Sequence, residues 1–184
     1  RKESSAASDV YKRQDNYITM ERIDRYFLDD EDGTTQFINI PKAKIYGTEV
    51  SANYLFDIFE SSLSYTSMRG RDLTNHRFLW DLPADVYAFT QKAYFDKYDF
   101  VIGYSISHTL EQNRINPEMV EQRTRKTGSY SLQDIFMLKR FKKNFEVSLK
   151  IDNLGNKEYR KHASHLYEVK ENIKFGFKYK VNTY

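Results

Sequence analysis

The chain has 184 residues, of which 30% are charged, and 29 basic residues against 26 acidic ones give a formal net charge of +3. This small excess, without a long basic tract, argues against nucleic acid as a partner. Zero cysteines exclude disulfide bonds and thiolate metal sites, and no run of about 18 apolar residues marks a membrane-spanning helix. Spanning strands are not excluded, because they alternate polar and apolar residues and give a mild mean hydropathy, here −0.75.

The first 14 residues look foreign to the rest of the chain. Residues 1–14 show neither strand nor helix periodicity, and they lack the initiating methionine and the apolar centre of a signal peptide. Residues 5–14 resemble the translation of sequencing-adapter DNA. We therefore expect 1–14 to be a foreign or disordered tail, the biological sequence to begin near Asp15, and the natural protein to extend further upstream.

From Asn16 onward the chain is predicted to be all-β, because β-rich segments recur between turn signals and no segment has a convincing helical period. Most segments reach the length of about 9–11 residues with which a tilted strand crosses a membrane. We expect about eight long strands, near 16–24, 36–56, 60–68, 84–95, 98–112, 128–141, 144–154 and 170–181.

The predicted connections alternate between short and long. Short turns at 57–59, 96–97 and 142–143 alternate with long connections at 25–35, 69–83, 113–127 and 155–169. This alternation is typical of an up-and-down antiparallel meander whose two ends face different surroundings. Outer-membrane barrels have this form, with short periplasmic turns and long external loops. A soluble meander, such as a ligand-carrying barrel, is the alternative.

Alternation of polar and apolar residues assigns a face to each residue of the strands. Glu49 and Asp99 are predicted to face a polar lumen, opposite the side of Tyr46 to Phe56 and of Phe100 to Ile106 that would face lipid. Segment 128–141 is ambiguous, since Asp134 is in register with apolar residues. In the last two strands the lipid-facing set is Phe145, Val147, Leu149, Ile151, Ile173, Phe175, Phe177 and Tyr179.

Three stretches of the chain form a recognisable series. They are Asn39-Ile-Pro-Lys-Ala-Lys-Ile-Tyr-Gly-Thr-Glu-Val50, then Tyr130-Ser-Leu-Gln-Asp134 with 147–159, and the terminal strand 171–181. In this order and spacing they resemble the C-terminal barrel region of TonB-dependent outer-membrane receptors. The resemblance covers roughly 35–181.

The resemblance implies an outer-membrane location in a Gram-negative bacterium and active transport of an iron complex, a siderophore or haem, coupled to TonB. Such receptors close about 22 strands around a plug, so 15–184 would be the C-terminal fragment of the barrel. The plug domain and the segment that contacts TonB would lie upstream. The implied partners are the iron–siderophore or haem ligand, outer-membrane lipid and the TonB system, with no resident cofactor.

Candidate ligand-binding residues lie in the predicted external loops. Histidine and tyrosine ligate haem iron, and arginine pairs with carboxylates and anionic chelates. In addition, Trp80-Asp-Leu-Pro-Ala-Asp85 resembles the beginning of a late strand in haem receptors of the family. The candidates are Arg71, His76, Arg77, Trp80, Arg114, Tyr159, Arg160, His162, His165 and Tyr167.

No catalytic motif is present: the sequence lacks a glycine-rich phosphate loop after a strand, H-E-x-x-H and G-x-S-x-G. We therefore predict that the protein is not an enzyme. His162 and His165 alone are too few ligands for a structural metal site. Two alternatives to the transporter remain at this point, a self-contained small outer-membrane barrel acting as an adhesin or structural protein, and a soluble ligand-binding barrel.

Overall fold

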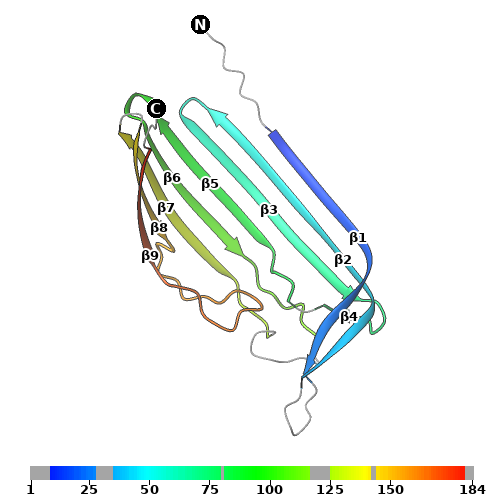
Figure 1. The fold of residues 1–184 in the computed structure, drawn as a ribbon. Helices are drawn as coiled ribbons and strands as arrows, with labels where there is room; N and C mark the ends of the chain where they lie inside the picture. The colour runs from blue at the N-terminus through cyan, green and yellow to red at the C-terminus, as the bar shows by residue number, and fades with distance from the viewer. Residues whose placement is uncertain (1–8, 28–34, 80, 117–124, 142–143, 181–184) are drawn as a thin grey trace.

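The computed structural model describes residues 9–27, 35–79, 81–116, 125–141 and 144–180, with the backbone alone described up to residue 39 (Figure 1). The predicted all-β class and the number of long strands are confirmed. The two-residue β4 (Arg77–Phe78) pairs with β3 inside a long connection. The long strands are β1 (Asp9–Phe27), β2 (Thr35–Phe56), β3 (Phe59–Asp72), β5 (Val86–Phe95), β6 (Phe100–Thr109), β7 (Tyr130–Phe141), β8 (Phe145–Asp152) and β9 (Asn172–Tyr179).

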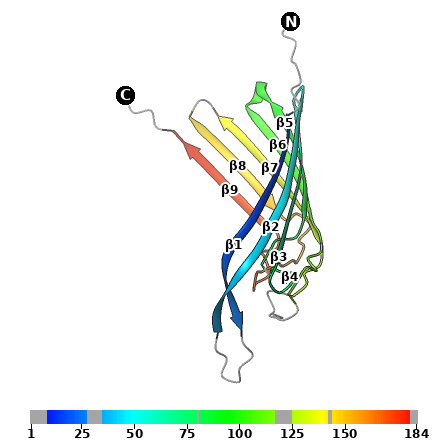
Figure 2. The same cartoon turned by 90° about the vertical axis from the view of Figure 1, so that its right-hand side faces the viewer.

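The long strands form one antiparallel sheet in the order β1-β2-β3-β5-β6-β7-β8-β9, so each strand pairs with its neighbours in sequence. The sheet is a single curved wall, as Figures 1 and 2 show. β1 and β9 lie at opposite edges, and the described strands therefore form an open sheet. The two alternatives, a self-contained small outer-membrane barrel and a soluble ligand-binding barrel, would require a closed sheet. Within the described residues, no helix has the length and apolar character needed to cross a membrane.

The two ends of the sheet differ as predicted. At the short-turn end, Asp57 and Asp99 adopt positive φ angles of 52° and 46° that close tight turns. At the loop end lie the described parts of the long connections 73–85, 110–129 and 153–171; in Figure 1 this end is at the bottom. The turn 142–143 and the connection 28–34 lie outside the described residues.

Several strand boundaries differ from the prediction, and pairing explains the differences. β1 begins at Asp9 rather than near residue 16, because Asp9 already pairs with Asn53 of the long β2. β3 continues to Asp72, so Arg71 lies in a strand rather than in a loop. β6 ends earlier than predicted, at Thr109. Backbone hydrogen bonding to a neighbouring strand extends or ends a strand independently of its own side-chain alternation.

The register divides the sheet into an apolar and a polar face, because directly opposed residues of an antiparallel pair point to the same side. The polar face carries Glu49, Glu60, Lys92, Lys150 and Lys174. The apolar face continues without a break from β2 to β9 and leaves large side chains exposed. These are Tyr46, Tyr54, Phe56, Phe59, Leu63, Tyr87, Phe89, Ile102, Phe145, Ile173, Phe175, Phe177 and Tyr179.

The register also resolves the facing of β7, which the sequence left ambiguous. Met137 pairs with Leu149 on the apolar face, so Asp134 and Phe136 lie on the polar face. Phe136 is accommodated there because it lies opposite Gly103 of β6, where any Cβ would overlap the phenyl ring. A glycine on one strand thus makes room for an aromatic ring on the next.

Aromatic residues of the apolar face cluster at the short-turn end. Phe95 and Phe100 flank one turn with ring centroids 5.9 Å apart, and Phe141 and Phe145 flank the next turn at the same separation. Phe56 and Phe59 are partners in the strand register across the turn between β2 and β3. Aromatic girdles of this kind mark the membrane–water boundary of outer-membrane barrels.

A small hydrophobic core lies at the loop end, on the polar face. Ile40, Ala43 and Leu79 are buried together, and Ile45 and Leu82 pack against them. Leu79 and Leu82 lie directly over Gly70, where a Cβ would overlap both side chains. The connection between β3 and β5 therefore folds back over the polar face instead of extending into solvent.

Candidate ligand site at the loop end

The buried polar side chains of the described residues lie at or near the loop end. A buried polar group is costly unless it is hydrogen-bonded, so such groups mark positions where the connections are held in one conformation. They are Asp72, Asp85, Gln112, Asn116, Thr127 and Asn153.

Asp85 fixes the start of β5. Its carboxylate accepts hydrogen bonds from both Nη atoms of Arg69, at 2.5 and 2.6 Å, from Arg114 Nη2 at 3.2 Å and from Tyr65 Oη at 3.3 Å. The Arg69 guanidinium holds the pKa of Asp85 below its usual range, against the opposing effect of burial. Asp85 thereby ties β3 to the connection 110–129.

Gln112 ties that connection to its neighbour. The Nε2 of Gln112 donates to the carbonyl oxygens of Leu82 and Pro83, at 2.8 and 2.9 Å, and its backbone pairs in both directions with Thr127. The two halves of the connection 110–129 are therefore joined at their base. The half that contains Gln112 also contacts the connection 73–85.

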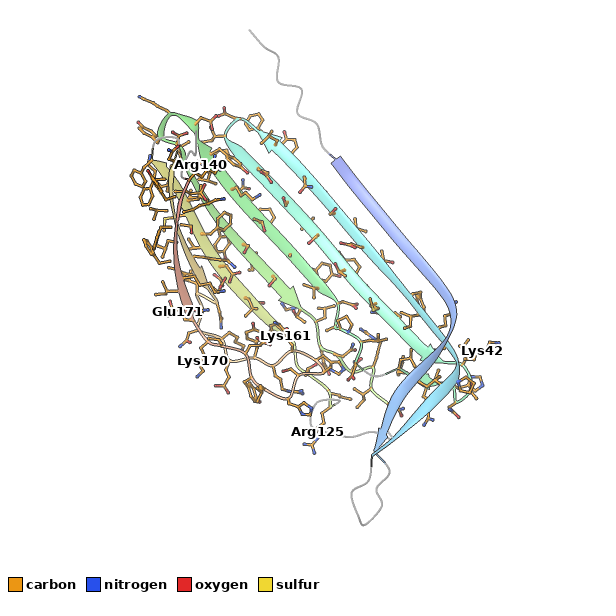
Figure 3. All side chains as sticks on the ribbon, viewed as in Figure 1. Lys42, Arg125, Arg140, Lys161, Lys170 and Glu171 are labelled. Atoms are coloured by element: carbon orange, nitrogen blue, oxygen red, sulfur yellow. The ribbon has the colours of Figure 1, made fainter. Side chains whose placement is uncertain are left out.

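The connection 153–171 folds on itself. Asn153, with φ of 55°, donates from Nδ2 to the Lys157 carbonyl and accepts from the Lys157 amide at Oδ1. The Glu168 amide donates to the Tyr159 carbonyl at 2.9 Å, and Arg160 Nη1 donates to the Ser164 carbonyl at 2.6 Å. In Figure 3, Lys161 and Lys170 of this connection lie at the loop end, far from Arg140 at the short-turn end.

Of the predicted candidates near β3 and β5, Arg71 and Arg77 have structural partners. Arg71 lies over the Phe78 ring, 4.8 Å from its centroid, and Arg77 forms an ion pair with buried Asp72 at 3.4 Å. His76 is exposed in a turn with φ of 55°. Trp80 lies outside the described residues. Arg71, His76 and Arg77 do not line the cavity that the candidates of the last connection share.

A cavity of about 280 Å³ lies between the start of β7 and the last connection. It brings three predicted candidates together, Tyr159, Arg160 and Tyr167. It adds Lys126, Lys157 and Tyr130, which were not predicted because a lysine or tyrosine beside a strand end carries no motif in the sequence. The full lining is Lys126, Thr127, Gly128, Ser129, Tyr130, Lys157, Glu158, Tyr159, Arg160 and Tyr167.

The cavity is cationic and aromatic. Its acidic residue, Glu158, is engaged by Lys170 at 3.1 Å, whereas Lys126 and Lys157 have no ion pair among the described residues. The Tyr130 and Tyr159 rings meet at 4.5 Å between centroids, and burial raises the pKa of Tyr159. Such a lining suits an anionic ligand with planar or aromatic groups, which would contact ammonium groups and ring faces together.

The two histidines of the last connection, His162 and His165, differ in burial. His162 is half-buried, and its Nδ1 lies 3.2 Å from Oγ1 of the cavity residue Thr127. Burial lowers the pKa of His162. His165 is exposed. Among the described residues, no group of three or more His, Cys, Asp or Glu side chains is placed to hold a metal ion.

Several solved structures share this fold. The copper transporter OprC superposes with a TM-score of 0.83 at 19% identity, over 94% of this chain and 28% of that one. A mutant of the ferric enterobactin receptor PfeA from Pseudomonas aeruginosa gives 0.70 at 15% identity, over 97% of this chain and 29% of that one. The FrpB iron transporter from Neisseria meningitidis gives 0.66 at 13% identity, over 94% and 30%.

These identities establish the fold, and the chain spans less than a third of the length of these three proteins. No curated protein matches the sequence. The family model for the β-barrel of TonB-dependent receptor-like proteins matches residues 8–154, which is most of the chain. This protein therefore belongs to the TonB-dependent receptor β-barrel family, whose members are transporters of the Gram-negative outer membrane.

Proposed function

We propose that residues 15–184 form the C-terminal part of the barrel of an outer-membrane receptor that imports an iron complex in a TonB-dependent manner. The observation that carries this proposal is the cationic, tyrosine-lined cavity between β7 and the last connection. Lys126 and Lys157, which have no ion pair among the described residues, offer ammonium groups to an anionic chelate. Tyr130 and Tyr159 offer aromatic surface next to them.

The two faces of the sheet support a membrane setting. The continuous apolar face, with its aromatic girdle at the short-turn end, would contact lipid. The polar face would line a lumen in which charged side chains stay hydrated. A closed barrel satisfies its backbone groups internally, which is why such a wall can cross a bilayer. The plug domain and TonB contact would come from another part of the receptor.

The similar structures are described as transporters or receptors for copper, iron, ferric enterobactin and pyoverdine, which supports a metal complex as the cargo. Haem is the second ligand that we consider, because His162 lies beside the cavity residue Thr127. Its half-buried ring and the exposure of His165 give haem less support than the cavity gives an anionic chelate.

The test uses the complete receptor in a strain that lacks its own ferric-chelate receptors. Ferric enterobactin, an anionic tricatecholate complex, and haemin serve as alternative probes. We expect the Lys126→Gln/Lys157→Gln double variant to bind ferric enterobactin about tenfold more weakly, since two charge-assisted contacts are lost. Lys161→Gln is the matched control, because Lys161 lies four residues from Lys157 but pairs with Glu168 at 3.3 Å.

Dissipating the proton motive force should abolish uptake of the chelate and leave surface binding intact. Equal affinity of the double variant and the wild type would remove the cavity from ligand binding. Haemin binding that is lost in His162→Ala, with no binding of ferric enterobactin, would favour haem instead. The absence of any uptake by the wild type with either probe would contradict the proposed function.

A further inference from the structure

Charge is distributed unevenly over the polar face of the sheet. On β2 and β3, between Ile45 and Asp72, the polar-face positions carry acidic residues and no Lys or Arg. On β7 to β9 and just beyond, five cations accompany three carboxylates. The cations are Arg140, Lys150, Lys174, Lys178 and Lys180, and the carboxylates are Asp134, Glu146 and Asp152.

The carboxylates of this region are already engaged. Asp152 forms ion pairs with both Lys150 and Lys174, the latter at 2.6 Å. Glu146 accepts from Arg140 at 3.0 Å, and Asp134 accepts from the Asn153 amide at 2.8 Å. Lys178 and Lys180 have no ion pair among the described residues. The β7–β9 side of the polar face therefore carries an excess of two positive charges, which lies toward the short-turn end, where Lys178 and Lys180 are.

The polar face of β7–β9 is continuous with the cavity, and its excess positive charge lies further along, toward the short-turn end. Tyr130, which lines the cavity, is the first residue of β7, and Lys157 follows the end of β8 by a few residues. Lys174 lies on the loop-end half of β9, and Lys178 follows four residues later, about 13 Å along the strand at the usual rise per residue. Arg140 marks the short-turn end in Figure 3.

We propose that the polar face of β7, β8 and β9 forms a cationic track along which the anionic chelate moves from the cavity toward the short-turn end. This inference rests on the proposed function and adds a path to it. Lys150, Lys174 and Lys178 provide successive sites, and Asp152, which pairs with both Lys150 and Lys174, prevents either of these two from holding the anion tightly. Passage requires binding that is favourable enough for the anion to enter and weak enough for it to leave.

The test separates binding from transport in the complete receptor, again with ferric enterobactin as the probe. Lys174→Gln/Lys178→Gln removes two charges from the track, and Lys174→Arg/Lys178→Arg preserves them. Lys97→Gln is the control for lost charge, because Lys97 lies in the short turn outside the track. Heat-modifiable mobility in gels verifies that each variant folds as a barrel.

We expect the Gln double variant to keep its equilibrium affinity and to take up the probe about tenfold more slowly, which corresponds to a barrier raised by about 1.4 kcal/mol. The Arg double variant and Lys97→Gln should transport at the wild-type rate. Unchanged uptake in the Gln variant would overturn the track while leaving the proposed function intact. Equal losses of affinity and uptake would also overturn it, by making these lysines part of the binding site. A wild-type receptor that imports no ferric chelate would overturn both proposals.

Discussion

The loop end and the strand wall of this protein are stabilised in different ways. At the loop end, Asp85, Gln112 and Asn153 are buried and hydrogen-bonded to neighbouring connections, so this end is held together by contacts within the protein. In the part of the chain that the structure describes, the wall is a single layer of strands with no second sheet packed on it (Figure 2). Its apolar face exposes Phe175 to 70% and Phe177 to 75%.

The difference shows which part of the fold depends on its surroundings. An apolar surface of this extent is unstable in water unless something covers it, and in a barrel the covering is lipid. The loop end must instead keep its shape in water, which explains its dense polar network. Substitutions in the wall should therefore act through the membrane, and substitutions at the loop end through internal contacts.

The largest expected effect comes from a charge on the apolar face of the wall. Leu149 pairs with Phe175 and Met137 on that face, and its neighbour Ser148 lies on the polar face. Leu149→Arg should destabilise the barrel by about 2–4 kcal/mol, the cost of a cation facing lipid near the bilayer centre. Ser148→Arg should cost far less. Urea unfolding of the complete receptor in lipid vesicles measures both, and equal costs would contradict the assignment of faces.

A smaller effect is expected from the ion pair that anchors the loop end. Arg69→Met removes the bidentate partner of Asp85, which is 7% exposed, and should cost about 2–3 kcal/mol because a buried carboxylate loses its main counter-charge. Arg140→Met breaks the pair with Glu146, in which Arg140 is 64% exposed, and should cost less than about 1 kcal/mol.

The same unfolding experiment compares these two variants, and similar costs would show that the loop end is no more dependent on internal ion pairs than the wall. Acid provides a second check. Because the pKa of Asp85 is lowered in the folded state, its contribution to stability is present above the ordinary aspartate range and is lost as the pH falls through that lowered pKa. Arg69→Met should remove this part of the acid sensitivity.

The sequence predicted the wall well and the loop end poorly, for a physical reason. Strict alternation of polar and apolar residues, as in 145–152 and 173–179, assigns each residue of a strand to one face of the sheet. Together with the alternating short and long connections, this pattern predicted the number, order and facing of the strands. β7 was the exception, because Phe136 breaks the alternation and is explained by Gly103 on the neighbouring strand. That compensation joins residues far apart in sequence.

The loop-end contacts have no periodic signal. The backbones of Gln112 and Thr127 pair across the connection 110–129, and nothing in the sequence around either residue predicts this pairing. Only some of the candidates chosen by residue type lie together. Tyr159, Arg160 and Tyr167 line the same cavity. Arg71 and Arg77 have structural partners elsewhere. Which side chains converge depends on tertiary packing of the loops.

Within the wall, the packing of Phe136 against Gly103 offers a more local test. Gly103→Ala would place a methyl group in the Phe136 ring, and the ring must shift to accommodate it. We expect a loss of about 1 kcal/mol, at the low end for overpacking because a ring edge can move. Gly155→Ala is the control, since a Cβ there meets nothing within 4 Å. Phe136→Leu should relieve the cost of Gly103→Ala, and additive effects of the two substitutions would argue against the contact.

The smallest effect concerns the junction between the last connection and Thr127. The half-buried His162 has a pKa below its ordinary value of 6.5, chiefly because burial disfavours the charged ring. The unfolded junction therefore binds a proton more readily than the folded one as the pH falls below that value. The stabilisation that the neutral His162 ring gives is complete above pH 6.5 and is lost progressively as the pH falls below it.

Hydrogen-exchange protection of residues 159–168, corrected for intrinsic rates, should fall a few-fold as the pH is lowered from neutral to below 6.5. The fall should persist in a His165→Gln variant, whose substituted residue is exposed, and vanish in His162→Gln. If His165→Gln removed it instead, the junction would owe its pH dependence to the exposed histidine, and burial of His162 would have no part in holding the loop end together.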